Sequence, residues 1–106
     1  MSKNKQWPLK GVKVLDLGQI YNGPYAGFLL AHAGADVVKL EPLKGEGLRQ
    51  RGGGVIPLSF AMLNTNKRGI AINLKQERGK EILIELVKEA DVLLENFAPN
   101  AMERLG

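Results

Sequence analysis

Two apolar segments that flank a short helical segment constrain the fold more than any other feature of the sequence. VKVLDL, residues 12–17, alternates β-branched and aliphatic residues after Gly11, which predicts a buried strand. GQIYNGP predicts a turn, and PYAGFLLAHAG predicts a helix with Pro24 at its first position and Gly34 at its end. ADVVKLE, residues 35–41, predicts a second strand. Because strands joined through a helix pair in parallel, the sequence predicts an α/β fold with a mostly parallel sheet.

The segments that follow continue the alternation of strands and helices. The first predicted helix is apolar nearly all round, so we expect it to be covered on more than one side. Within residues 76–90, one apolar stripe recurs at helical spacing: Ile82, Leu83, Leu86, Val87 and Ala90. The other segments predict, in order, a loop over 42–57, a short helix over 58–64, strands over 69–74 and 91–96, and the start of a helix in 98–106.

The predicted sheet is incompletely covered by predicted helices. The last strand contains VLL, and a parallel strand of this kind needs helices on both faces. Only a fragment of helix follows it. Although 106 residues suffice for one small domain with a single core, we expect residues 1–106 to be the truncated N-terminal part of a larger domain.

The composition argues against several functional classes. No stretch approaches the roughly 18 consecutive apolar residues of a membrane span, and the polar start MSKNKQWPLKG lacks the apolar segment of a secretory signal. With no cysteine and a single histidine, His32, no metal site is expected. The formal charge of +4 comes from cations spread along the chain, so nucleic-acid binding is not expected. Together these features favour a cytoplasmic protein that binds neither membranes nor nucleic acids.

No group of residues in the chain has the pattern of a catalytic constellation. Ser59 lies in an apolar segment and His32 lies within a predicted helix, so neither has believable triad partners. Asp16, Asp36 and Asp91 each adjoin a predicted strand, where a structural role is the ordinary interpretation.

Ligands of open parallel sheets bind at the carboxyl ends of the strands. After the first strand comes GQIYNGPYAG, whose glycines would let the backbone approach a ligand at a helix N-terminus, or would merely allow a tight turn. Gly18, Gly23 and Gly27 lack the spacing of the dinucleotide fingerprint, although Glu41 ends the second strand where a ribose-binding acid would lie. GGGVIPLS lacks the lysine of a phosphate loop. A dinucleotide is therefore a minor alternative.

Cations flank the third predicted strand in NTNKRGIAINLK. Lys67 and Arg68 precede the strand and Lys75 follows it, about 20 Å away if the strand is extended. A long ligand with several phosphates would meet all three, or each cation serves a different partner, or they are solvated or paired with Glu77 or Glu81.

The fourth predicted strand ends in ENF, and an arginine follows. The amide of Asn96 could meet an adenine edge or a backbone group, and Phe97 could stack on a flat ring. Arg104 lies two helical turns beyond Phe97 and could reach a phosphate. The alternative, in which Phe97 is a core residue and Arg104 a surface residue, remains open at this point.

Three stretches together resemble the N-terminal segment of the family III CoA transferases: LKGVKVLDL with GPYAGFLLAHAGADVVKLEP, NTNKRGIAINLK, and ADVLLENFAPNAMERLG. The resemblance runs over nearly the whole chain. It implies a Rossmann-like part of an interlocked homodimer, with acyl-CoA and carboxylic-acid substrates. It also implies coenzyme A as substrate and product rather than as a tightly bound cofactor, and CoA is a polyphosphate ligand long enough to meet scattered cations.

In formyl-CoA transferase-like members, CoA contacts come from the first strand–helix turn, the strand after NKR, the ENF strand end and the following arginine. Many members have an arginine where this chain has Pro42, so Lys39, Lys44 or Arg49 would have to replace that contact. The family also varies at the position of Tyr21. Carried onto matching positions, the resemblance implies CoA contacts at Tyr21, Asn22, Ile72, Asn73, Leu74, Lys75, Asn96, Phe97, Ala98 and Arg104.

The catalytic group of the family is an aspartate that forms acyl-anhydride and aspartyl-CoA thioester intermediates. It lies downstream of residue 106, so the resemblance implies that the whole protein is a CoA transferase and that this chain alone is inactive. Two alternatives remain: an acyl-CoA racemase of the same family, and an independent nucleotide-binding module without chemistry.

Overall fold

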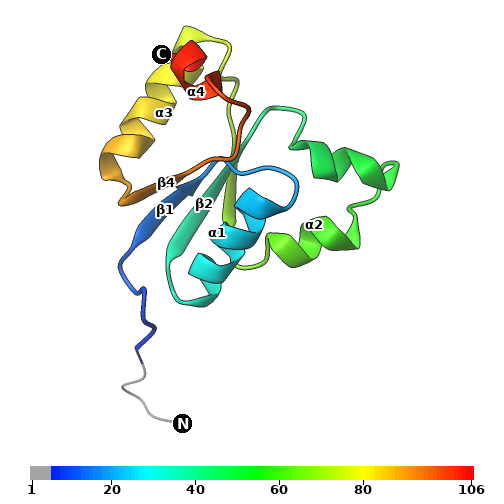
Figure 1. Ribbon diagram of the computed structural model, residues 1–106, viewed down its shortest axis with the longest axis vertical. Coiled ribbons are helices and arrows are strands. Elements are labelled where there is room, and N and C mark those ends of the chain that lie inside the picture. The colour runs from blue at the N-terminus through cyan, green and yellow to red at the C-terminus, as the bar shows by residue number, and fades with distance from the viewer. Residues whose placement is uncertain (1–5) are drawn as a thin grey trace.

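The computed structural model describes residues 6–106 and contains one parallel sheet with helices on both faces (Figure 1). The four strands pair in the order β3-β2-β1-β4. They comprise β1 (Lys13–Asp16), β2 (Asp36–Glu41), β3 (Arg68–Ala71) and β4 (Val92–Leu94). The helices are α1 (Asn22–His32), the 3₁₀ helix η1 (Gly47–Gly52), α2 (Leu58–Leu63), α3 (Glu77–Glu89) and α4 (Ala101–Leu105). The predicted α/β class and the all-parallel pairing are confirmed.

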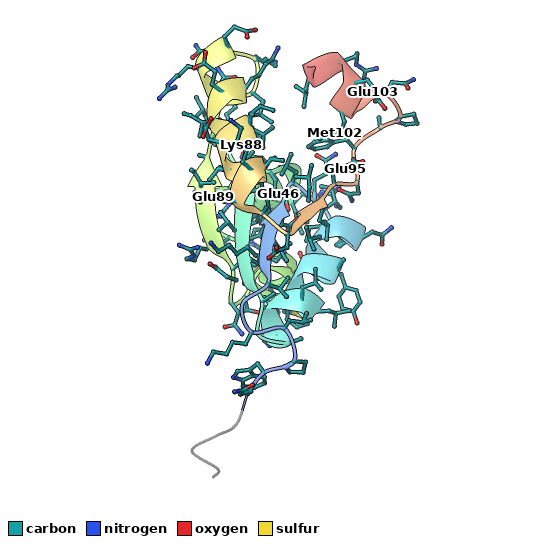
Figure 2. All side chains as sticks on the ribbon, turned by 90° about the vertical axis from the view of Figure 1, so that its left-hand side faces the viewer. Glu46, Lys88, Glu89, Glu95, Met102 and Glu103 are labelled. Atoms are coloured by element: carbon teal, nitrogen blue, oxygen red, sulfur yellow. The ribbon has the colours of Figure 1, made fainter. Side chains whose placement is uncertain are left out.

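The two faces of the sheet carry different cores because successive strand residues point to opposite sides. On the α3 side, Leu15, Leu17 and Leu40 pack with Ile72 and Leu83. On the α1 side the apolar core is smaller, and its buried members are Val14, Ala31, Ala35 and Val37. Figure 2 shows α3 and α1 on opposite sides of the sheet.

Helix α1 is less covered than its apolar sequence predicts. Its buried residues are small or cyclic, namely Gly23, Pro24, Gly27 and Ala31, whereas about half of the surface of Tyr25 and Leu29 is exposed. The expectation of cover on more than one side is therefore wrong for the part of the chain that the structure describes. Small residues on the sheet side let the helix axis approach the strands, and Tyr25 and Leu29 point outward.

The predicted ends of α1 are close to the observed ones. The helix begins at Asn22, so Pro24 lies within the first turn and not at its first position. Its missing N–H costs nothing there, because the first four N–H groups of a helix have no partner within the helix. Gly34 follows the helix with φ of 105°, as the predicted left-handed end requires.

The third strand is shorter than predicted and ends at Ala71. Its sheet neighbour β2 ends at Glu41, and Pro42 follows with no N–H to donate. After Ile72 donates its N–H to Glu41 O (2.9 Å), the chain turns away through Asn73, whose side chain accepts from Lys75 N at 3.0 Å. This turn brings residues 72–75 to the edge where the strands end.

The structure also places a 3₁₀ helix inside the predicted loop 42–57. The Glu46 side chain caps this helix by accepting from Leu48 N at 2.8 Å. Among residues 6–106, no helix has both the length and the apolar character needed to cross a bilayer.

Leu83 and Ile84 are adjacent on α3, but the first is buried and the second is half exposed. We expect Leu83→Ala to lower the free energy of unfolding by about 2–5 kcal/mol, because it leaves a cavity in the core on the α3 side. The matched change Ile84→Ala should cost less than about 1 kcal/mol. Urea denaturation of the two variants checks this prediction, and equal losses would contradict the observed orientation of α3.

Candidate functional site

A pocket of about 410 Å³ lies where the carboxyl ends of the four strands meet. Its size falls in the range of small-molecule sites. Its walls come from the segments that follow each strand and from α4. The lining residues are Leu17, Gly18, Gln19, Leu40, Pro42, Glu46, Ile72, Asn73, Leu74, Lys75, Phe97, Ala101, Arg104 and Leu105.

The pocket brings together six of the ten residues that the resemblance implies for CoA binding: Ile72, Asn73, Leu74, Lys75, Phe97 and Arg104. They come from two segments that are separated by α3 and β4 in the sequence. Tyr21, Asn22, Asn96 and Ala98 do not line it. Tyr21 and Asn22 lie at the start of α1, exposed to solvent.

Sequence reasoning missed several lining residues. Leu17 and Leu40 were placed only within predicted strands, and Glu46 lies in a glycine-rich stretch without hydrophobic periodicity. The sequence could have indicated Leu17 and Leu40 as lining residues, since each is the last apolar residue of a predicted strand and ligands bind at strand ends. Nothing in the sequence pattern indicated Glu46.

The pocket combines aliphatic and aromatic walls with two cations. Lys75 and Arg104 are exposed, and within residues 6–106 neither side chain has an acidic partner within 4.0 Å. Leu40, Leu74 and Phe97 provide apolar surface in the same pocket. Such a pocket suits a ligand that has both an apolar or flat part and a negative charge.

Asn96 does not point its amide into the pocket. Its Oδ1 accepts from Gln19 N at 2.8 Å, and its Nδ2 donates to Gln19 O at 2.9 Å. Both amide atoms are thus used to hold the loop between β1 and α1. Of the two interpretations of Asn96, an adenine edge or a backbone group, the structure shows the backbone contact.

A buried ion pair lies under the N-terminus of α1. Lys67 Nζ is 2.8 Å from Asp16 Oδ2, and the two side chains are 1% and 0% exposed. The same ammonium donates to Pro24 O (2.9 Å) and to Asn64 Oδ1 (2.8 Å). Burial lowers the pKa of Lys67 below its usual value, although the ion pair with Asp16 opposes that shift. The structural role expected of Asp16 is confirmed.

Two further ion pairs surround this one on the same face of the sheet. Lys39 Nζ lies 3.5 Å from Glu46 Oε1 and donates to Gly18 O at 3.0 Å. Arg49 donates from Nε to Glu41 Oε1 at 2.7 Å and from Nη2 to Glu41 Oε2 at 3.0 Å. Burial alone would raise the pKa of Glu41, but hydrogen bonds from Arg49 and Glu46 N and the charge of Arg49 hold it below its usual value of 4.5. The hydrogen bond to Glu41 raises the pKa of Arg49.

These pairs account for four cations that were candidates for ligand binding. Lys67 is paired with Asp16, and Arg68 with Asp36. Of the alternatives left open for these cations, the structure favours pairing, although the partners are Asp16 and Asp36 and not Glu77 or Glu81. Of the three residues named to replace the arginine at position 42, Lys39 and Arg49 are also paired, which leaves the exposed Lys44.

The three glycines after β1 allow this arrangement because any side chain would collide with it. A Cβ at Gly18 would lie 2.7 Å from the Gly23 backbone, and one at Gly27 would lie 2.5 Å from Asp16 Oδ2. The interpretation as a tight turn and close packing is therefore supported.

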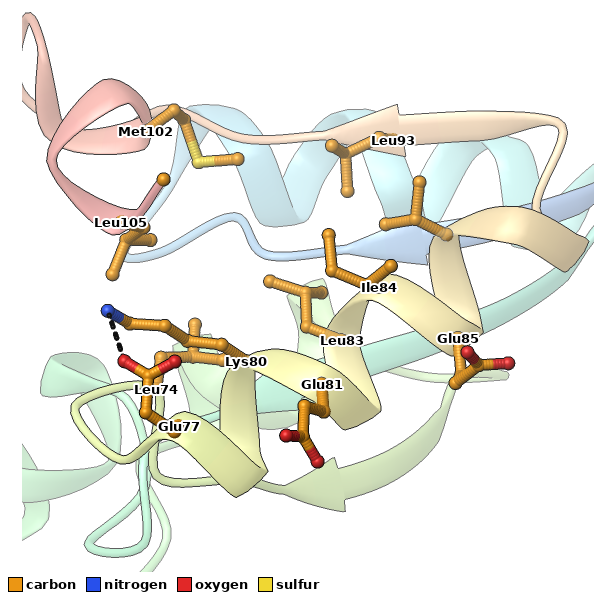
Figure 3. Close-up of a pocket in the computed structure, with 12 residues that line it drawn as sticks. Leu74, Glu77, Lys80, Glu81, Leu83, Ile84, Glu85, Leu93, Met102 and Leu105 are labelled. Atoms are coloured by element: carbon orange, nitrogen blue, oxygen red, sulfur yellow. Dashed lines mark ion pairs between the residues drawn. The ribbon is translucent and has the colours of Figure 1, made fainter.

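A second, larger pocket of about 670 Å³ lies between α3, β4 and α4 (Figure 3). Ile84 and Leu83 face Leu93 and Met102 across it. Its charged rim residues are paired: Glu77 with Lys80, Glu81 with Arg78, and Glu85 with Lys88. With no unpaired cation in its lining, this pocket is a poorer match for an anionic ligand than the pocket at the strand ends.

The lining of the strand-end pocket offers no pair of groups for acid–base or nucleophilic chemistry. Its one carboxylate, Glu46, is buried and faces Lys39, and its other polar side chains are amides and cations. Within residues 6–106, no three His, Cys, Asp or Glu side chains are grouped so that they could hold a metal ion.

The fold is an α/β unit with a parallel sheet, and a pocket with two unpaired cations in its lining lies at the strand ends. Residues 9–106 match the profile of CoA-transferase family III, and the chain belongs to that family. Formyl-CoA:oxalate CoA-transferase of Streptomyces coelicolor is 50% identical over 101 residues, which are 92% of this chain and 25% of that protein. An acyl-CoA transferase of Fusarium pseudograminearum is 38% identical over 117 residues, covering 99% of this chain and 26% of the other.

A solved structure gives the same result. The crystal structure of a CAIB/BAIF family protein from Brucella suis superposes with a TM-score of 0.88 and 35% identity, over 95% of this chain and 29% of that one. The predicted family is therefore confirmed. The chain spans about a quarter of the length of the curated relatives that it matches.

Lys67 and Arg68 offer a matched comparison of a buried and an exposed ion pair. We expect Lys67→Met to lower the free energy of unfolding by about 3–5 kcal/mol, because it leaves Asp16 buried without its counter-charge. Arg68→Met should cost less than about 1 kcal/mol, since Arg68 and Asp36 are 71% and 47% exposed. Urea denaturation near neutral pH measures both. Similar losses would show that the Asp16–Lys67 pair is not buried in solution.

The lowered pKa of Glu41 predicts a pH dependence of stability. Its contribution is present above pH 4.5, the usual pKa, and is lost as the pH falls through the lower folded value. The free energy of unfolding of the wild type should exceed that of Glu41→Gln at about pH 6, and the difference should shrink toward about pH 3. Glu81→Gln, on the exposed side of α3, controls for the loss of one negative charge. A difference that is constant over this range would contradict the prediction.

Proposed function

We propose that the chain is the N-terminal CoA-binding part of a CoA transferase, which moves CoA between an acyl-CoA thioester and a free carboxylic acid. The observation that carries this proposal is the convergence of six implied CoA contacts on one pocket, two of which are unpaired cations. Membership of CoA-transferase family III supports it.

CoA has the two properties that the pocket favours. Its adenine ring and pantetheine arm are flat or extended and partly apolar, and its phosphates are anionic. Leu74 and Phe97 supply apolar contact, while Lys75 and Arg104 supply charge to the phosphates. Tyr21 and Asn22 lie outside the pocket, so a ligand that also meets them has to extend beyond it, as CoA can.

The chemistry of the whole protein is proposed to need residues that this chain lacks. An aspartate downstream of residue 106 would attack the thioester carbonyl and displace the CoA thiolate, which gives an acyl anhydride. The thiolate would then attack the aspartyl carbonyl, release the donor acid and leave an aspartyl-CoA thioester. The acceptor carboxylate would attack that thioester to form a second anhydride, and the thiolate released would attack its acyl carbonyl, giving the new acyl-CoA and restoring the aspartate. The chain alone would then bind CoA without turnover. We further propose that the whole protein is a cytoplasmic homodimer. Formyl-CoA and oxalate, for which the Streptomyces coelicolor relative is named, are the first donor and acceptor to test.

Titration of the chain with CoA tests the binding proposal. We expect CoA and acetyl-CoA to bind more tightly than NAD or ATP, and Lys75→Ala or Arg104→Ala to weaken CoA binding about tenfold each, the value of one charge-assisted contact. Lys88→Ala, at an exposed and paired cation on α3, should leave the affinity unchanged. Calorimetry with the four ligands provides the measurement. Equal binding of ATP and CoA would favour a general nucleotide-binding module.

A hybrid enzyme tests the activity. We expect formyl-CoA:oxalate CoA-transferase of Streptomyces coelicolor to retain CoA transfer when its matching N-terminal quarter is replaced by this chain. The same hybrid with Arg104→Ala should have a raised KM for the acyl-CoA. Racemisation of a 2-methylacyl-CoA by the whole protein, without CoA transfer, would instead favour the racemase branch.

A further inference from the structure

Ile20 has a backbone conformation that β-branched residues rarely adopt. Its φ is 63°, in the left-handed region, where the Cβ of an L-residue crowds the following carbonyl oxygen. In the described part of the chain, the other non-glycine residues with positive φ are Asn66 and Asn100, and asparagine tolerates this region. Ile20 is therefore an unusual and strained residue, and it directly precedes Tyr21 and Asn22.

The residues before Ile20 are fixed by side chains from two other strand ends. Gly18 O accepts from Lys39 Nζ at 3.0 Å. Gln19 is held through both its N–H and its carbonyl oxygen by the amide of Asn96, at 2.8 and 2.9 Å. The chain therefore enters Ile20 from a backbone that cannot readily rotate.

Glu46 holds Ile20 itself. Its Oε2 accepts from Ile20 N at 3.3 Å and from Leu48 N at 2.8 Å. The carboxylate is only 4% exposed, and its Oε1 faces Lys39 Nζ at 3.5 Å. A buried carboxylate that faces a buried cation is held firmly in place, since moving it would leave each charge buried without its counter-charge.

We propose that Glu46 is a positioning residue: it holds Ile20 in the left-handed conformation, and so fixes the direction in which Tyr21 and Asn22 leave the sheet toward the bound CoA. Strained backbone persists only where the surroundings impose it, and it tends to occur at binding and catalytic loops. The contact of Tyr21 and Asn22 with CoA rests on the proposed function. The effect of Glu46 on the conformation of Ile20 is independent of the proposed function.

A purely structural role for Glu46 has to be separated from this one, because Glu46 also caps η1 through Leu48 N. A substitution at position 20 distinguishes the two roles. Asparagine accepts the left-handed conformation with little strain, so Ile20→Asn should keep the positive φ without the hydrogen bond to Glu46. The same substitution does not restore the cap of η1.

The test measures the backbone conformation of residue 20 by NMR and CoA affinity by calorimetry in the same variants of the full chain. In Glu46→Ala we expect φ of Ile20 to return to negative values and CoA affinity to fall about tenfold. In Glu46→Ala with Ile20→Asn, the positive φ and most of the affinity should return. Glu85→Ala makes the same change at an exposed acid on α3 and should alter neither.

Ile20→Asn keeps the proposal testable if Glu46→Ala does not fold, when it is compared with Ile20→Ala, which also removes the partly buried side chain but keeps the strain of a positive φ. Ile20→Asn should have the higher urea midpoint of unfolding of the two and should leave CoA affinity within about twofold of the wild type. A midpoint no higher than that of Ile20→Ala would show that the left-handed conformation is not strained in solution and would overturn the proposal.

The remaining outcomes separate the two proposals. A positive φ that persists in Glu46→Ala, or a double variant that recovers neither φ nor affinity, would overturn the role of Glu46. If φ responds as expected but the wild-type chain binds no CoA, the proposed function fails and the anchoring of Ile20 is supported.

Discussion

Asp16 and Lys67 face each other at 2.8 Å beneath α1, fully removed from water. Each of these buried charges is stabilised by the other, because burying either one alone would cost a large desolvation free energy. Lys67 therefore ties the start of β3 to the end of β1, and through Pro24 O it also holds the first turn of α1. Gly27 is small because Asp16 lies directly beneath it. The relative positions of three elements thus depend on one pair.

The same face of the sheet carries the other buried charges, and together they set the shape of the binding edge. Lys39 connects the end of β2 to Gly18, and Glu46 connects the segment before η1 to Ile20. The opposite face carries the aliphatic core around Leu15 and Leu83. Polar anchoring on one side and apolar packing on the other leave a pocket at the strand ends. Core residues such as Leu17 and Leu40 form part of its wall, and Lys75 and Arg104 line it without an acidic partner.

Much of the fold was predictable because α3 carries a helical period, β1 alternates β-branched and aliphatic residues, and Pro24 and Gly34 mark the ends of α1. The buried ion pairs were not, since a sequence shows that Lys39 and Lys67 are charged but not which acid each one meets across the sheet. Residues 72–75, which the resemblance implies for CoA binding, lie at the strand-end pocket, and the strand before them ends earlier than predicted because β2 stops before Pro42. Asn96 was identified as a site residue, but its amide holds Gln19, a long-range contact that spacing cannot reveal. Ile20 gave no signal, because backbone dihedral angles are set by the anchors around it.

The separation between buried and exposed charges has a consequence for how the protein responds to its ionic surroundings. Pairs with almost no solvent contact, such as Asp16 with Lys67, are screened only weakly by dissolved ions, whereas exposed cations such as Lys75 and Arg104 lose much of their long-range attraction within about 10 Å at 0.1 M salt. Concentrated electrolyte would thus weaken the proposed binding of an anion at the strand ends at salt concentrations that leave the buried pairs intact. Ligand binding and the stability of the fold would differ in their sensitivity to salt.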